Sequence, residues 1–200
     1  MDRDVIVAGG SISGLFAARE IASMGHDVLV FEDDLEIGMP EKCDGLVSSK
    51  ALVALGISPS RKVIQNEIRR AILHSPCGSS IEIDTGQQNI FVLNRKEFDR
   101  ELARISVKYG AEIKVGTKIE EIVQCDKFVE VRFNNDQVNK SRVVIDSTGF
   151  RSIARSNKRG ILQAAKYEVQ GLPIEKDTVE LYFNQQISPG FFRWIIPKDE

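Results

Sequence analysis

The first thirty residues contain two short apolar runs with an amphipathic stretch between them. Residues 4–8 (DVIVA) and 27–31 (DVLVF) are rich in β-branched side chains, which is typical of buried parallel strands. Residues 13–24 carry apolar side chains at helical spacing, and Gly25 follows as a helix-ending residue. The order strand, helix, strand predicts a βαβ unit with a right-handed crossover.

After this unit the pattern changes to short segments. Residues 33–60 are rich in Gly, Pro and Ser, which predicts irregular structure with one helical turn around 49–55. Between residues 68 and 93, the β-like runs AILH, SIEI and IFVL are separated by the turn sequences PCG and TGQQN. These runs predict an antiparallel layer inserted into an α/β fold.

A second helix and further strands follow. Asn94 and Glu97 form an Asx-type relative of the capping box, and apolar residues then recur at helical spacing as far as Gly110. The remaining runs predict a parallel strand at 111–115, a meander at 118–133, a buried strand at 142–146 and short strands within 160–200.

Composition and charge exclude several classes of protein. The 200 residues are 42% hydrophobic with a formal net charge of −2, so the chain lacks the basic surface of a nucleic-acid-binding protein. No apolar run reaches the roughly 20 residues of a membrane-spanning helix. The chain enters its first strand at once, so no signal peptide is expected. Three widely spaced cysteines and two histidines predict no disulfide framework, no metal site and a cytoplasmic location.

The stretch VIVAGGSISGLFAARE at residues 5–20 is similar to the phosphate turn of dinucleotide-binding folds. Gly9 and Gly14 stand at the first and third glycine positions of G-x-G-x-x-G, which make the tight turn and let the helix pack on the strand. Ser11 replaces the second glycine and adds a hydroxyl that can donate to a phosphate oxygen. Together with Gly10 and Ser13, at the amino-terminal end of the predicted helix, these residues are candidates for binding a pyrophosphate.

Glu32 ends the second predicted strand, 18 residues after Gly14. A carboxylate in this position accepts a hydrogen bond from the adenosine ribose and repels the 2′-phosphate of NADP. It does not distinguish NAD from FAD, because their AMP halves are the same. By itself, the glycine pattern also leaves open a glycine-rich turn in some other α/β protein.

The segment VVIDSTGFRSIAR at residues 143–155 resembles the second fingerprint of the flavoprotein family that includes p-hydroxybenzoate hydroxylase. Gly149, Ser152 and Arg155 match the family's positions, whereas Thr148 replaces the usual aspartate and Asp146 lies two residues earlier. The family's R-x-x-F-D-x-x-L pattern is matched at Arg95, Phe98, Asp99 and Leu102. The resemblance implies FAD as the cofactor, with Arg95, Asp146 and Gly149 among the residues that contact it.

Two more segments resemble the geranylgeranyl reductase branch of this family. One is a P-x-x-C-x-G segment, and the other, FFRWIIP, is similar to the branch's YxWxFP substrate motif with phenylalanine in place of tyrosine. The matched residues are Pro40, Cys43 and Gly45 in the first segment and Phe192, Trp194 and Pro197 in the second. The resemblance implies that Cys43 is a catalytic residue near the flavin, that Gly45 also lies at the cofactor, and that the aromatic motif lines a lipid site.

The resemblance implies an FAD-dependent oxidoreductase of isoprenoid lipid biosynthesis, which reduces C=C bonds of geranylgeranyl or polyprenyl lipids by hydride transfer from reduced flavin. NAD(P)H or ferredoxin is the expected electron donor, and peripheral contact with the membrane is expected because the substrate is a lipid. An FAD-dependent aromatic-ring monooxygenase of the same fold is one alternative. A non-catalytic, truncated FAD-binding fragment is the other, because the family's third motif, Gly-Asp, lies past residue 200.

The expected fold is therefore α/β: a Rossmann-like FAD/NAD(P)-binding fold with an inserted, incomplete antiparallel β substrate layer. The FAD-binding domain is expected to be discontinuous, over residues 1–65 and 94–158. Residues 66–93 and 159–200 are expected to form part of the substrate-binding domain, and the C-terminal half of the family is expected to be missing.

Overall fold

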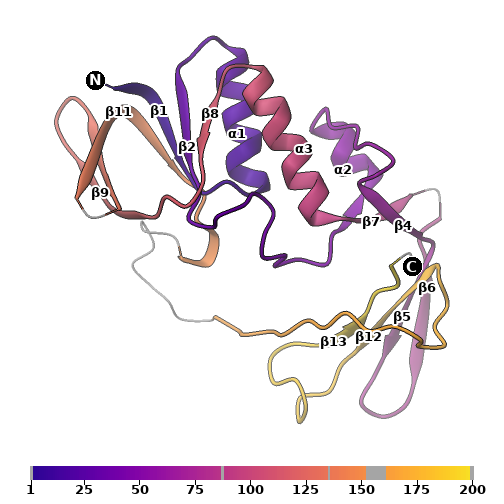
Figure 1. Cartoon of the computed structure of the whole chain (residues 1–200). Helices are drawn as coiled ribbons and strands as arrows, with labels where there is room; N and C mark the ends of the chain where they lie inside the picture. Colours follow the sequence, from indigo (N-terminus) through magenta and orange to yellow (C-terminus); the bar gives the residue numbers. More distant parts are fainter. Residues whose placement is uncertain (1, 87, 135, 152–160, 199–200) are drawn as a thin grey trace. The chain divides into compact units, whose positions relative to one another are not determined.

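The computed structural model of the chain, shown in Figure 1, describes residues 2–86, 88–134, 136–151 and 161–198. Internal contacts divide the chain into two compact units. The first unit is Met1–Lys42 with Arg95–Asn157, and the second is Cys43–Asn94 with Lys158–Glu200. Both units are therefore made of two separate stretches of sequence.

A six-stranded sheet in the order β8-β2-β1-β11-β10-β9 forms the first unit. The strands are β1 (Arg3–Ala8), β2 (Val28–Phe31), β8 (Glu112–Lys114), β9 (Ile119–Gln124), β10 (Val129–Phe133) and β11 (Gln137–Asp146). The first four strands in the sheet order run parallel, while β10 pairs antiparallel with both β9 and the first half of β11. Pairing with β10 explains why β11 begins five residues before the predicted strand.

Two helices, α1 (Ile12–Ser23) and α3 (Arg95–Lys108), lie side by side in this unit (Figure 1). The central strands of the sheet are buried on both faces. Val5 and Val7 of β1 share a buried cluster with Ala18 of α1, whereas Ile6 points to the opposite face and packs with Phe133 of β10. Burial on both faces is the physical reason why β1 is a continuous apolar run.

Two smaller sheets build the second unit, with the orders β3-β7-β4 and β13-β12-β5-β6. Their elements are β3 (Leu46–Ser48), α2 (Ser49–Ala54), β4 (Ile64–Ile68), β5 (Arg70–His74), β6 (Ser80–Asp84), β7 (Ile90–Leu93), β12 (Thr178–Tyr182) and β13 (Arg193–Ile195). Ile68, Val92 and Val179 come from both sheets and form their shared buried cluster.

The second unit differs from the sequence-based expectation in two respects. Its layer is not wholly antiparallel, because β5 and β12 pair in parallel. Residues 43–65, which were expected in the FAD-binding domain, belong to the second unit by their contacts. The physical reason is that β3 and β4, two strands that the sequence pattern did not predict, pair on either side of β7.

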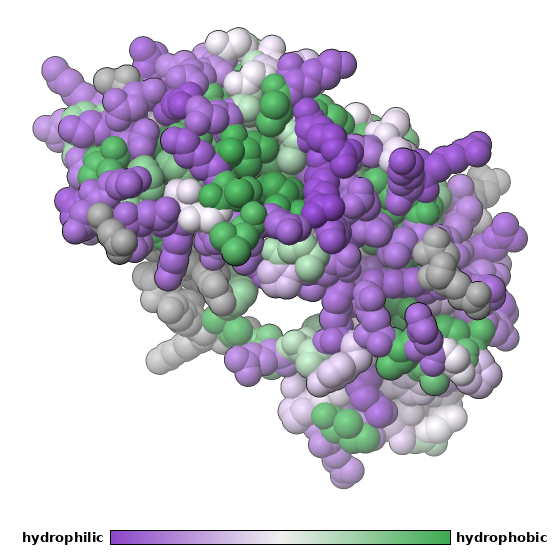
Figure 2. Space-filling model, in the orientation of Figure 1, coloured by the Kyte–Doolittle hydropathy of each residue, from purple (hydrophilic) through white to green (hydrophobic). Residues whose placement is uncertain are grey.

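The face of the molecule seen in Figure 2 is mostly hydrophilic, and apolar side chains show on it in separate areas. Among the described residues, none of the helices combines the length and hydrophobicity required to span a bilayer.

Candidate functional site

The turn between β1 and α1 requires glycine at two positions. Gly9 has a φ of 103°, and a Cβ added there would lie 2.6 Å from the carbonyl oxygen of Ser147. A Cβ on Gly14 would lie only 1.9 Å from the carbonyl oxygen of Gly9. The first glycine therefore allows the turn, and the third allows the helix to approach it closely.

The amino-terminal end of α1 presents unused hydrogen-bond donors. The amide of Leu15 donates to the carbonyl oxygen of Ser11 at 2.9 Å, and Ser11 is the N-cap residue, but its side chain makes no capping bond. Within the described part of the chain, the amides of Ile12, Ser13 and Gly14 donate to no protein acceptor. Such amides, together with the positive end of the helix dipole, form an anion-binding position.

The hydroxyl of Ser11 points to α3. Its Oγ donates to Oδ2 of Asp99 at 3.4 Å, and Asp99 is held in turn by Arg95, whose Nη2 donates to its two carboxylate oxygens at 3.2 and 3.3 Å. Burial raises the pKa of Asp99, although the Arg95 guanidinium acts in the opposite direction. Arg95 is thus placed near the turn through a buried carboxylate, which fixes a positive charge close to the candidate pyrophosphate position.

Glu32 is buried at the end of β2 and also contacts the turn. Its Oε2 accepts from the amide of Gly10 at 2.6 Å, and its Oε1 accepts from the amide of Asp34 at 3.0 Å. Burial is the main cause that raises the pKa of Glu32, and a hydrogen bond to Asp33 adds to it. A Cβ on Gly10 would lie 2.9 Å from Cδ1 of Ile37 and 3.0 Å from both Cβ and Oε2 of Glu32, so these two side chains pack closely on the glycine.

The loop after β11 lies against the same turn. Asp146 pairs in register with Ala8, and the amide of Ser147 donates to the carbonyl oxygen of Ala8 at 2.7 Å. Oδ1 of Asp146 accepts from both the amide and the hydroxyl of Thr148, and Gly149 follows with a φ of 67°. Two motifs about 140 residues apart in sequence therefore meet beside the glycine turn. The other predicted residues of this segment, Ser152 and Arg155, lie outside the described residues.

Cys43 and Gly45 belong to the second unit. Cys43 is exposed, and its carbonyl oxygen accepts from Nζ of Lys166 at 3.4 Å. Gly45 has a φ of 84°, and a Cβ there would lie 2.1 Å from the carbonyl oxygen of Leu93. Gly45 thus has a packing role, because the absence of a side chain lets the start of β3 approach β7.

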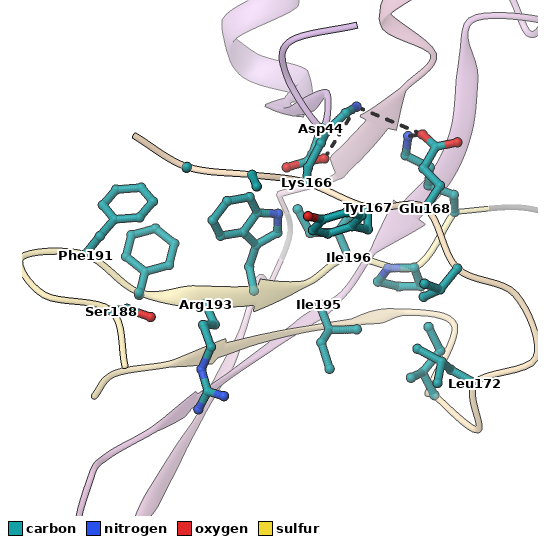
Figure 3. Close-up of a pocket in the computed structure, with 18 of the residues that line it drawn as sticks. Asp44, Lys166, Tyr167, Glu168, Leu172, Ser188, Phe191, Arg193, Ile195 and Ile196 are labelled. Carbon is teal, nitrogen blue, oxygen red and sulfur yellow. Dashed lines mark hydrogen bonds and ion pairs between the residues drawn. The ribbon is translucent and has the colours of Figure 1, made fainter. Parts of the chain in front are cut away.

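A cleft of about 1300 Å³ opens within the second unit (Figure 3). All three residues of the predicted lipid motif, Phe192, Trp194 and Pro197, line it. Phe191 lies at one end of the view in Figure 3 and Leu172 at the other, which shows how far the lining extends. The structure therefore brings the substrate candidates together in one site.

Aromatic rings form one wall of this cleft. The rings of Phe191 and Phe192 are stacked with centroids 4.4 Å apart, and each meets Trp194 edge-on at about 6 Å. Phe183 extends the group, with its ring centroid 5.7 Å from that of Phe192. Mutual packing of this kind holds large apolar surfaces in fixed orientations, which suits an apolar ligand.

Charged residues line another part of the cleft. Lys166 is directed toward Asp44 and Glu168, at 3.7 and 4.0 Å, and Lys198 contacts Glu168 at 2.6 Å (Figure 3). The hydrogen bond from Lys198 lowers the pKa of Glu168. Sequence reasoning gave Lys166 no role, because it lies in a segment without periodicity. It also gave Asp99 no role at the turn, although its i,i+4 spacing from Arg95 is a signal for an ion pair.

Comparisons with known proteins place these features in a family. The family described as FAD dependent oxidoreductase matches residues 4–157. Digeranylgeranylglycerophospholipid reductase 2 of Methanopyrus kandleri is 31% identical over the whole chain and 53% of its own length. A crystal structure of a geranylgeranyl bacteriochlorophyll reductase-like protein of Thermoplasma acidophilum is similar with a TM-score of 0.82 at 27% identity, covering 99% of this chain and 54% of that one.

PqsL of Pseudomonas aeruginosa has the same fold, with a TM-score of 0.70 at 17% identity over 99% of this chain and 58% of that one. The family match agrees with the geometry of the site, in which Glu32 and the loop after β11 both contact the glycine turn. The chain belongs to the FAD dependent oxidoreductase family.

Within that family, the similarity to the geranylgeranyl reductases confirms the resemblance found in the sequence. The α/β Rossmann-like fold and FAD as the cofactor are confirmed as well. The chain spans about half the length of the curated relatives that it matches.

Proposed function

We propose that the protein of which this chain is part reduces C=C bonds of geranylgeranyl or related polyprenyl lipids in an FAD-dependent reaction. The observation that carries the proposal is the aromatic cleft of the second unit, lined by Phe192, Trp194 and Pro197. An isoprenoid chain is apolar and flexible, and an aromatic wall beside aliphatic side chains matches its surface. The similarity to reductases of geranylgeranyl lipids supports the same substrate class.

The residues of the glycine turn fit an FAD pyrophosphate. The amides of Ser13 and Gly14 would donate to it, and Arg95 would add positive charge. Ser11 lies in the same turn, where its hydroxyl donates to Asp99, the residue that holds Arg95. Glu32 would accept from the ribose, since a carboxylate has lone pairs beyond the two that the loop amides use. Gly9, Gly10, Asp146 and Gly149 complete this proposed set. Reduced FAD, when bound, supplies a hydride.

Cys43 and Gly45 are proposed to lie at the flavin, on the strength of the motif that they share with the geranylgeranyl reductases. Exposure of the Cys43 side chain is compatible with contact to a ligand. In this proposal Cys43 contacts the reacting groups, and Phe192 and Trp194 exclude water from the alkene.

The electron donor is proposed to be NAD(P)H or ferredoxin. The substrate resides in lipid, so we propose that the protein works at the cytoplasmic surface of a membrane through peripheral contact. The cations that line the cleft, among them Lys166 and Arg193, would favour anionic headgroups over cationic ones.

An anaerobic experiment tests the proposal. Purified chain is reconstituted with FAD, which is followed by flavin absorbance near about 375 and 450 nm. After reduction with dithionite, di-O-geranylgeranylglycerol is added, and mass spectrometry detects the saturated product. Trp194→Ala should keep FAD and lose product, whereas Gly14→Ala should bind FAD more weakly. A fully reduced flavoprotein that leaves the lipid unchanged would contradict the proposed reaction, and chain that binds no FAD would support the fragment alternative.

A further inference from the structure

A β-bulge interrupts the pairing of β4 with β7. Ile64 pairs with Leu93 and Asn66 pairs with Val92, so Gln65 is an extra residue between two adjacent pairs. A bulge bends its strand and redirects the side chain of the inserted residue. The regular alternation of a strand therefore does not determine where the Gln65 side chain lies.

Gln65 is one of the residues that line the cleft. Its Oε1 is buried and has no hydrogen-bond partner among the residues that the structure describes. Buried acceptors without a partner are rare in folded proteins because each loses its bonds to water without replacement. The amide can turn toward a ligand at little cost, since the terminal torsion of a glutamine side chain is soft.

The strand is fixed at the cleft by the residue that follows. Nδ2 of Asn66 donates to the carbonyl oxygen of Lys176 at 2.6 Å and to that of Pro197 at 3.0 Å. These bonds connect the bulge to the lipid motif and to the segment that leads into β12. Gln65 is thus held beside the wall of the cleft by a neighbour whose own amide is fully engaged.

The charges around the cleft restrict which donor Gln65 would meet. Lysines at 166, 176 and 198 and Arg193 line the cleft, against the carboxylates of Asp44 and Glu168. The excess of cations disfavours a ligand that carries an ammonium group. A hydroxyl is a donor without charge, and a neutral carboxamide oxygen is a suitable acceptor for it.

We propose that Gln65 is a specificity-determining residue that accepts a hydrogen bond from a hydroxyl at the polar end of the lipid. This inference rests on the proposed function, because it assumes that a polyprenyl lipid occupies the cleft. The apolar chain would lie along the aromatic wall, and the hydroxyl would fix its depth in the site. A ligand without that hydroxyl would leave Oε1 buried and unpaired, so the cleft would bind it more weakly.

The single tryptophan of the chain, Trp194, lines the same cleft, so its emission reports on occupancy without any need for activity. The purified full chain is titrated in detergent with di-O-geranylgeranylglycerol, which has one free hydroxyl, and separately with the methyl ether of that hydroxyl. We expect the alcohol to bind about tenfold more tightly than the ether. Gln65→Leu should bind both with equal affinity, and Gln65→Glu, which keeps an acceptor, should retain a preference for the alcohol.

Gln170→Leu is the matched control, because it makes the same change at an exposed amide that lines the same cleft. It should leave the preference for the alcohol unchanged. If unaltered chain binds alcohol and ether equally, or if Gln65→Leu keeps the preference, the role of Gln65 is refuted while the lipid site stands. If neither lipid changes the Trp194 emission, the proposed substrate class fails together with the role of Gln65.

Discussion

Replacing Gly14 with alanine is expected to reduce both the stability of the chain and its affinity for FAD. An added Cβ would lie 1.9 Å from the carbonyl oxygen of Gly9 and 3.1 Å from Cγ1 of Val7. Val7 belongs to β1 and Gly9 to the β1–α1 turn, and the nearer obstacle, the Gly9 carbonyl oxygen, is backbone. The start of α1 would have to move away from the turn by roughly 1 Å to relieve the contact.

The magnitude follows from two opposing effects. Alanine is intrinsically better than glycine inside a helix by about 1 kcal/mol. Overpacking costs about 1–3 kcal/mol, and the upper end applies at Gly14 because a backbone oxygen cannot rotate away. We expect a net loss of about 2 kcal/mol in the free energy of unfolding. The displaced amides would also lose charge-assisted hydrogen bonds to the pyrophosphate, each worth about 1.5–3 kcal/mol, so FAD affinity should fall by at least about tenfold.

Urea unfolding followed by circular dichroism measures the first effect, and FAD titration followed by flavin fluorescence measures the second. Gly25→Ala is the control at the other end of α1, where φ is +87° and a Cβ would meet nothing within 4 Å. This variant should lose about 1 kcal/mol through its left-handed backbone and keep its FAD affinity. A Gly14→Ala chain as stable as the unaltered one, with equal FAD affinity, would refute the packing argument.

Three further outcomes are expected. Asp99→Ala should lower the free energy of unfolding by about 3 kcal/mol, because it leaves Arg95 without its buried partner. Glu121→Ala removes one residue of an exposed pair with Arg132 and should cost less than about 1 kcal/mol. Equal losses for the two variants in urea unfolding would contradict this expectation. Burial raises the pKa of Glu32 in the folded chain, so folding favours the protonated carboxyl. The contribution of this group to the free energy of unfolding is therefore complete below its unfolded pKa of about 4.3, and it is lost as pH rises through its pKa in the folded chain. The urea midpoint of unaltered chain relative to Glu32→Gln should therefore fall with rising pH, and a pH-independent difference would refute it. The hydrogen bond from Ser75 lowers the pKa of Cys77 to about 7, so alkylation of Cys77 should show a midpoint near pH 7 that Ser75→Ala moves upward; an unmoved midpoint would exclude this cause.

Much of the first unit is determined by local sequence pattern. The runs at 4–8 and 27–31 are apolar throughout their buried parts because both faces of a parallel strand are covered, and the intervening helix has one apolar face. The contacts that demand glycine at position 14 also occur within this βαβ unit, with Gly9 and Val7. At Gly9 the glycine pattern is local, but the close contact comes from Ser147 in the loop after β11.

The second unit was harder to predict because its strands are short and depend on partners far away in sequence. β3 has three residues, and it is a strand only because β7 pairs with it more than forty residues later. The parallel pairing of β5 with β12 likewise joins segments more than one hundred residues apart. These pairings also explain why the boundary between the units lies after Lys42 and not at residue 65.

The sequence by itself indicated the glycine turn and the acid at the end of β2, because both follow from the pattern of neighbouring residues in one βαβ unit. It indicated Phe192, Trp194 and Pro197 through their resemblance to the motif of a known family. Only the tertiary structure decided that Glu32 binds the amide of Gly10, that Ser11 meets Asp99, and that a bulge places Gln65 in the cleft. Those contacts depend on strand register and helix packing. Strand register and helix packing depend on the burial of many side chains together, so they cannot be predicted from any single motif.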